Sequence, residues 1–237
     1  MRNVFGNREQ EPLLGVPAST WAAPPQGPSV SLLDALREPI YRRAVVAVIA
    51  AMFAQQATGI NCVIMYSVEI LGDTLPSSAA LITVAISAVN VLVAIMCAPL
   101  ADKIGRKPCL LFSISGMGIG SFLLAMGLIH EVPGLSVFAT FLFVISFALG
   151  LGPVPFILAS ELVDSEAFGA VQSWGLTACW LANFSVAQFF PMLSTALPNG
   201  HVFLGFVVIA IAIGSFIAWW VPESKGKATT GEVWGDK

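Results

Sequence analysis

The sequence predicts an all-α integral membrane protein that folds as a six-helix bundle. Apolar residues make up 57% of its 237 residues and charged residues only 11%, whereas soluble domains average roughly 45–50% and about 25%. Six apolar runs are long enough to cross a bilayer, which takes about 20 helical residues. The basic residues all fall on one side of the arrangement that these runs define.

Short polar turns separate the six predicted transmembrane helices and make consecutive helices antiparallel neighbours. The chain divides into a flexible, proline-rich segment over 1–43, a membrane region over 44–221 and a tail over 222–237. The predicted helices cover residues 44–71, 77–100, 109–129, 135–160, 172–196 and 202–221.

Orientation follows from lysine and arginine, which accumulate in cytoplasmic loops. Of the 11 basic residues, five precede the first helix, three lie between the second and third, and three follow the sixth. An even number of helices places these regions on one side, so we expect both termini in the cytoplasm. The net charge of −3, without a basic stripe, argues against a nucleic acid partner.

The four cysteines give no sign of a disulfide framework or a metal site. They lie in or beside apolar runs, without the spacing of metal ligands, and we expect small buried side chains and no cofactor. They are Cys62, Cys97, Cys109 and Cys179.

Clusters of glycine and proline interrupt the first and fourth predicted helices. These helices lead the two three-helix sets, a pattern typical of transporters built from 3+3 inverted repeats, whose sites lie between broken helices. The alternative is that these residues only permit kinks or close packing, and for the fourth helix the two interpretations are balanced. The predicted break residues are Gly59, Gly152, Pro153 and Pro155.

Uncharged amide side chains gather within the first predicted helix, at Gln55, Gln56 and Asn61. Polar groups at membrane depth are costly unless they are paired or line a path. Amides both donate and accept hydrogen bonds, as sugar hydroxyls require, without a charge that would hold the ligand too tightly. On an unbroken helix Gln56 and Asn61 would point about 140° apart, so we expect unwinding near Gly59.

Other candidate ligands lie in the remaining helices. Asn90 and Asn183 belong to the second and fifth predicted helices, although a hydrogen bond between helices explains each of them, taken singly, better than a ligand does. Phe156 and Trp180 are placed to offer apolar contact to the C–H faces of a sugar ring. A tryptophan in a membrane protein more often faces lipid or the core.

Four segments resemble, in family order, the motifs of the sugar porters of the major facilitator superfamily, which include the glucose facilitators. They resemble the QQ-x-S/T-G-I-N…Y-S/Y, D/E-R/K-x-G-R-R/K, G-P-x-P-W…x-E-L and P-E-T/S-K-G motifs. The segments are Gln55–Asn61 with Tyr66 and Ser67, Ala101–Lys107, Gly152–Pro155 with Ser160–Leu162, and Val221–Gly226. The chain is most similar to a fungal branch, some of whose members are vacuolar.

This resemblance implies the C-terminal half of a major facilitator fold, helices seven to twelve. Ala148 stands where glucose facilitators often have a carboxylate, and Cys179 where they have an amide, so we expect a different hydroxyl preference. The residues that the resemblance implies as sugar contacts are Gln55, Gln56, Asn61, Asn90, Phe156, Trp180 and Asn183.

The resemblance also implies a cytoplasmic gate, in which charged residues of two short loops pair in the outward-facing state. Asp102, Arg106 and Glu161 fit this cluster, whereas Phe168 replaces an expected arginine. We expect the loss of one partner to weaken the gate. The alternative for Asp102 and Lys107 is that they anchor a helix end near water.

The resulting hypothesis is transport of a hexose-like sugar by alternating access, together with an N-terminal six-helix bundle. We expect facilitated diffusion, because the deep parts of the predicted helices carry no charged residue that could relay protons. Proton symport stays open as an alternative. We expect a multi-pass protein in the plasma or vacuolar membrane.

Two alternatives come from other classes of protein. One is a membrane sensor, or a truncated product, that does not transport alone. The other is an intramembrane enzyme, which we disfavour because both histidines fall in predicted external loops and the helices lack acid pairs.

Overall fold

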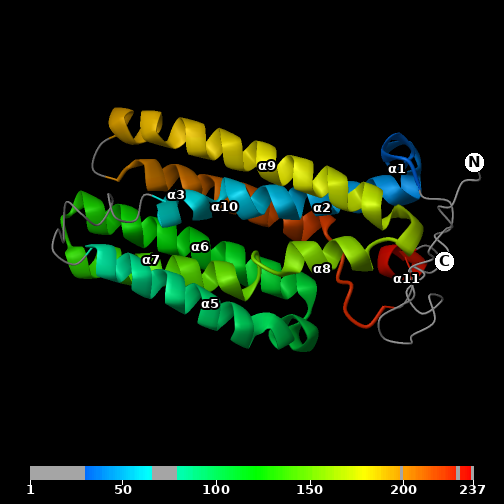
Figure 1. The fold of residues 1–237 in the computed structure, drawn as a ribbon, viewed down its shortest axis with the longest axis horizontal. Coiled ribbons are helices and arrows are strands. Elements are labelled where there is room, and N and C mark those ends of the chain that lie inside the picture. The colour runs from blue at the N-terminus through cyan, green and yellow to red at the C-terminus, as the bar shows by residue number, and fades with distance from the viewer. Residues whose placement is uncertain (1–29, 66–78, 198–199, 228–229, 236–237) are drawn as a thin grey trace, which may run out of the picture.

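A computed structural model of the chain describes residues 30–65, 79–197, 200–227 and 230–235. These residues form helices and turns, with no strand among them. Most of the helices lie along the long axis of the molecule (Figure 1). In chain order they are α1 (Leu32–Arg37), α2 (Pro39–Ala57), α3 (Ile60–Met65), α5 (Ala79–Ile104), α6 (Arg106–Ile129), α7 (Pro133–Leu149), α8 (Val154–Glu161), α9 (Ser165–Ala196), α10 (Val202–Trp220) and α11 (Thr230–Trp234).

The described residues form six helical rods along the bundle, and two of these rods are interrupted: α2 continues as α3, and α7 continues as α8. Five of the rods are long and apolar enough to cross a membrane, at Pro39–Ile64, Arg106–Ile129, Pro133–Glu161, Ser165–Ala196 and Val202–Trp220. Helix α5 adds a shorter apolar stretch over Leu81–Cys97. An interrupted rod therefore leads each three-helix set.

Residues 32–43 differ from the flexible segment that the sequence predicts, because α1 and the start of α2 are helical. The Trp174 indole N–H on α9 donates to the Leu32 carbonyl at 3.0 Å, and the Val30 N–H donates to the Glu166 carbonyl at 3.1 Å. Isolated helices this short are unstable, so these tertiary contacts stabilise α1. Residues 1–29 lie outside the described residues.

Small side chains bring the helices close together. Helix α2 packs along α9, and α6 packs along α7. A Cβ added at Gly120 of α6 would lie only 3.0 Å from the Cβ of Phe143 on α7. Within a bilayer, such close contact between helices is a main source of stability. The fully buried alanines of α2 are Ala44, Ala47, Ala51 and Ala54.

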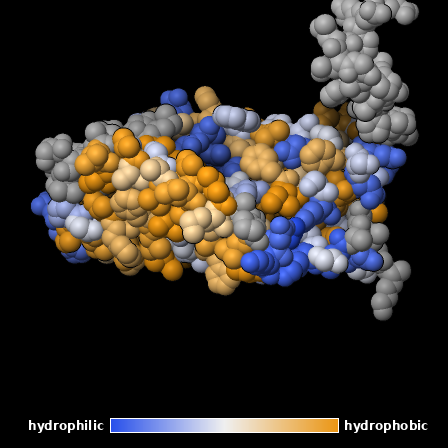
Figure 2. Space-filling view, turned by 60° about the horizontal axis from the view of Figure 1, so that its bottom comes forward, coloured by the Kyte–Doolittle hydropathy of each residue, from blue (hydrophilic) through white to orange (hydrophobic). Residues whose placement is uncertain are grey.

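The outer surface of the bundle is apolar over most of its length. Figure 2 shows large apolar side chains along the rods, and hydrophilic residues gathered most densely at one end. Ile95 and Trp219 are 68% and 76% exposed. Contiguous apolar surface of this extent is what a lipid environment covers.

Gly120→Ala is expected to lower the free energy of unfolding by about 1 to 3 kcal/mol, because the added methyl group must push the α7 backbone away. Thermal unfolding in detergent measures the effect. The matched control is Gly205→Ala, since a Cβ at Gly205 meets nothing within 4 Å. Equal unfolding temperatures for the two variants would contradict the close contact of α6 with α7.

Candidate functional site

The first rod is interrupted at Gly59. Helix α2 ends at Ala57, Gly59 has a φ of 92°, and α3 begins at Ile60. This position requires glycine for two reasons. Other residues rarely adopt that φ, and a Cβ would lie 2.8 Å from the Phe206 ring. The turn changes the direction in which the side chains on either side of it point.

Three amides converge at this turn, and we call Gln56, Asn61 and Asn183 the amide cluster. The Asn61 amide N–H group donates to Gln56 Oε1 at 2.8 Å and to Asn183 Oδ1 at 2.7 Å. Gln56 and Asn61 would point about 140° apart on a continuous helix. The interruption thus brings together amides of α2, α3 and α9, and all three side chains are partly accessible.

The other interrupted rod, formed by α7 and α8, is interrupted between Leu149 and Val154. Gly150, Leu151 and Gly152 form the turn, Pro153 precedes the first residue of α8, and Pro155 lies in its first turn. The Leu151 N–H donates to Ser113 Oγ at 3.0 Å. Side chains thus supply hydrogen-bond partners that the continuous helix would have provided.

Gln55 joins the two interruptions. Its amide nitrogen donates to the carbonyls of Leu151 and Gly152 at 2.9 and 3.1 Å. The side chain is only 6% exposed. Both N–H bonds of this amide are therefore used within the protein, and in this conformation Gln55 positions the site rather than offering donors to a ligand.

The Cys179 thiol lies between the two glutamines. Its Sγ is 3.5 Å from Gln55 Oε1, to which it donates, and 3.4 Å from Gln56 Nε2, from which it accepts. Thiols are weak hydrogen-bond partners. Cys179 therefore completes the contacts of both glutamines without the two-sided bonding of an amide.

The other predicted sugar contacts are not members of this hydrogen-bonded group. Phe156 is 42% exposed on α8, and Trp180 is 66% exposed on α9. Asn90 lies half-buried on α5 and makes no described side-chain hydrogen bond to the amide cluster. Hydrogen bonds thus link Gln55, Gln56, Asn61 and Asn183, directly or through Cys179, and among the described residues Asn90, Phe156 and Trp180 take no side-chain part in them.

A charged cluster lies at one end of the bundle. The Arg106 Nε–H donates to both carboxylate oxygens of Glu161 at 2.9 Å. The Nη2 of the same guanidinium lies 2.7 Å from Asp102 Oδ1. Ser224 Oγ donates to Glu161 Oε2 at 2.7 Å. We call these four residues the charged cluster. It ties the start of α6 and the end of α8 to the segment after α10.

The neighbouring Glu223 caps α6. Its carboxylate accepts the backbone N–H groups of Arg106 and Lys107 at 2.9 and 3.2 Å. A carboxylate at a helix N-terminus satisfies unpaired N–H groups and favours the helix dipole. Sequence reasoning found the motif that contains Glu223 and Ser224 but gave neither residue a role.

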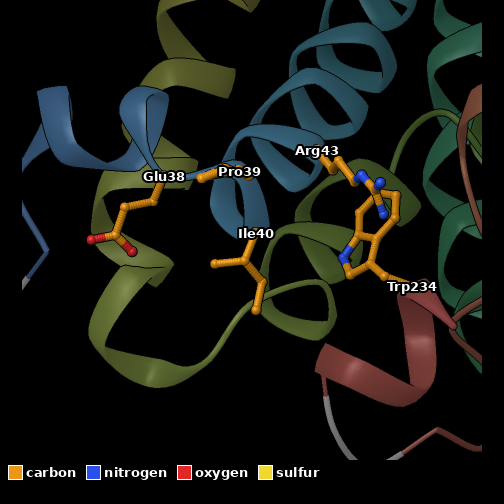
Figure 3. Close-up of a pocket in the computed structure, with 5 residues that line it drawn as sticks. All are labelled: Glu38, Pro39, Ile40, Arg43 and Trp234. Atoms are coloured by element: carbon orange, nitrogen blue, oxygen red, sulfur yellow. The ribbon is translucent and has the colours of Figure 1, made fainter. Parts of the chain in front are cut away.

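A pocket of about 470 Å³ is lined by Glu38, Pro39, Ile40, Arg43 and Trp234, which Figure 3 draws. Arg43 and Trp234 lie on one side of it, and the Glu38 carboxylate lies on the other. Arg43 precedes Gln56 by 13 residues, which is about 20 Å along a helix. The pocket is therefore separate from the amide cluster.

The interrupted rods, the amide cluster and the charged cluster define one half of a major facilitator transporter fold. The family model described as sugar (and other) transporter matches residues 18–231. The chain therefore belongs to the sugar transporter family.

Two relatives and one solved structure illustrate the match. The chain is 38% identical over 204 residues to a probable metabolite transport protein of Saccharomyces cerevisiae, covering 86% of this chain and 42% of that protein. It is 33% identical over 174 residues to vacuolar protein sorting-associated protein 73 of the same yeast, covering 73% and 36%. It matches the proton:xylose symporter XylE, bound to 6-bromo-6-deoxy-D-glucose, with a TM-score of 0.72 and 29% identity, over 86% of this chain and 46% of that chain. XylE comes from Escherichia coli. The chain thus spans less than half the length of these relatives.

Glu161→Gln is expected to lower the free energy of unfolding by about 1 to 3 kcal/mol, because it leaves the Arg106 charge without its bidentate partner. Thermal unfolding of the purified protein measures the loss. Glu166→Gln serves as the control, since that side chain is exposed at the start of α9. If both variants unfold at the same temperature, the charged cluster does not hold the end of α8.

Proposed function

We propose that the chain is the C-terminal bundle of a transporter that moves a hexose-like sugar across a membrane by alternating access. The amide cluster carries the proposal, because it places uncharged hydrogen-bonding groups beside an interrupted helix within an otherwise apolar bundle. Its Asn61 contacts, at 2.7 and 2.8 Å, join three helical segments. Interrupted helices near the bilayer midplane are where such transporters bind their solutes.

The chemistry of the cluster suits a sugar. Gln56, Asn61 and Asn183 each offer a carbonyl oxygen and an NH₂ group, and a hydroxyl both donates and accepts. A sugar that enters would replace the hydrogen bonds that the amides now make with one another. Cys179, which bonds to both Gln55 and Gln56, stabilises this arrangement. Phe156 and Trp180 supply apolar surface for the sugar ring.

Alternating access requires a second bundle to rock against this one. We propose that an N-terminal six-helix bundle covers the face that carries Phe156 and Trp180, which are 42% and 66% exposed here. The coverage of less than half of the relatives supports this requirement. The charged cluster acts as the gate that is closed in the outward-facing state.

Facilitated diffusion is the mode that we propose for this bundle. The charged side chains of the described rods lie at the rod ends, as Arg43, Asp102, Arg106 and Glu161 do. The related XylE is named a proton:xylose symporter. A carboxylate that couples transport to protons would therefore belong to the partner bundle.

The proposed location is the plasma or vacuolar membrane, with both termini in the cytoplasm. The basic residues that the structure describes support this orientation. Lys225 donates to the Lys103 carbonyl, and Trp220 to the Arg43 carbonyl, so three basic regions meet at one end. Basic residues of transmembrane proteins concentrate on the cytoplasmic side.

Asn61→Ala is expected to raise the half-saturating hexose concentration about tenfold or more, since each lost hydrogen bond contributes about 1 kcal/mol. Uptake of labelled D-glucose and D-xylose into vesicles, with and without the N-terminal bundle, measures the effect. Ser185→Ala is the control, because Ser185 is exposed on α9 and donates to the Leu181 carbonyl. Unchanged uptake by the Asn61 variant would contradict the proposed site.

A further inference from the structure

Gln172 has a buried carbonyl oxygen without a hydrogen-bond partner in the described part of the chain. Its Oε1 is shielded from solvent and makes no hydrogen bond to any residue that the structure describes. A buried amide oxygen that lacks a donor is costly, so such groups call for a physical explanation. Neither the amide cluster nor the charged cluster includes Gln172.

The helical register places Gln172 on the same face of α9 as two residues of the site. Cys179 follows Gln172 by seven residues and Asn183 follows it by 11, so on an α-helix all three lie within about 40° of one another. Cys179 and Asn183 contact Gln55, Gln56 and Asn61 across the helix interface. Gln172 therefore faces the same side of α9 as the amide cluster.

Gln172 also lies between the two clusters along the bundle. Seven residues of helix put it about 10 Å from Cys179, toward the N-terminal end of α9. That end follows directly on Glu161, the last residue of α8, and α9 packs against α8 as well as α2. A solute that leaves the amide cluster for the charged end would pass along this face.

We propose that Gln172 is a second polar station on the sugar path. After the charged cluster opens, Gln172 Oε1 accepts a hydrogen bond from a hydroxyl of the sugar. This contact lies between the amide cluster and the charged end of the bundle. In the conformation shown, with Arg106 and Glu161 paired, this oxygen is shielded from solvent and no described residue donates to it. The inference rests on the proposed transport function and adds a site to it.

The test attaches a thiol reagent to a Gln172→Cys variant in vesicles that hold the chain together with its N-terminal bundle. We expect the introduced thiol to be labelled. A D-glucose concentration about ten times the half-saturating value should slow the labelling about tenfold, by mass action. The control is Ser173→Cys, one residue along on an exposed face of α9, where D-glucose should have no effect.

Labelling that D-glucose leaves unchanged, or no labelling at all, would overturn the station. D-glucose uptake by the parent chain in the same vesicles separates the two hypotheses. If D-glucose is taken up but does not slow the labelling at position 172, only the proposed role of Gln172 is contradicted. If D-glucose is not taken up, the proposed transport function is contradicted as well.

If the cysteine variant does not fold, Gln172→Leu takes its place, because leucine keeps the approximate size but cannot accept a hydrogen bond. The half-saturating D-glucose concentration for efflux from the charged side should then rise about tenfold, the effect of roughly one lost hydrogen bond. Ser173→Ala should leave it unchanged. An efflux value equal to that of the parent chain would contradict the proposal.

Discussion

The hydrogen bonds from Gln55 to the carbonyls of Leu151 and Gly152 are the interaction on which the site depends. A helix interrupted within a bilayer leaves backbone groups that lipid cannot satisfy. Gln55 supplies the missing donors at 2.9 and 3.1 Å, and it precedes the turn at Gly59 that interrupts its own rod. One side chain therefore stabilises the second interruption and joins it to the first. Beyond Gly59, Asn61 is held in turn by Gln56 and Asn183.

Helix α8 is held by side-chain hydrogen bonds at both ends. At its start Gln55 binds the turn that precedes Val154, and at its end Glu161 binds Arg106 and Ser224. Helix α8 thus runs from the turn bound by Gln55, which neighbours Gln56 of the amide cluster, to Glu161 of the charged cluster.

The fold class follows from the sequence because apolar length and charge placement are properties of the chain itself. The turn at Gly59 can also be predicted from the local sequence. Amides at membrane depth are costly unless they are paired or line a path, and a glycine among them permits the helix to break. Helix ends are different. Helix α6 begins at Arg106 rather than at residue 109, because Glu223, over 100 residues away, caps it. The supporting role of Gln55 likewise depends on tertiary contacts with Leu151 and Gly152, which no pattern in its own helix contains.

The Gln55→Leu variant tests the central claim most directly, with D-glucose binding followed by tryptophan fluorescence in the chain paired with its N-terminal bundle. Leucine cannot donate to the carbonyls of Leu151 and Gly152, so the two interruptions should lose their connection and the amide cluster its arrangement. We expect the fluorescence response to D-glucose to disappear while circular dichroism still shows the helical content of the parent chain. A variant that binds D-glucose as the parent chain does would contradict it.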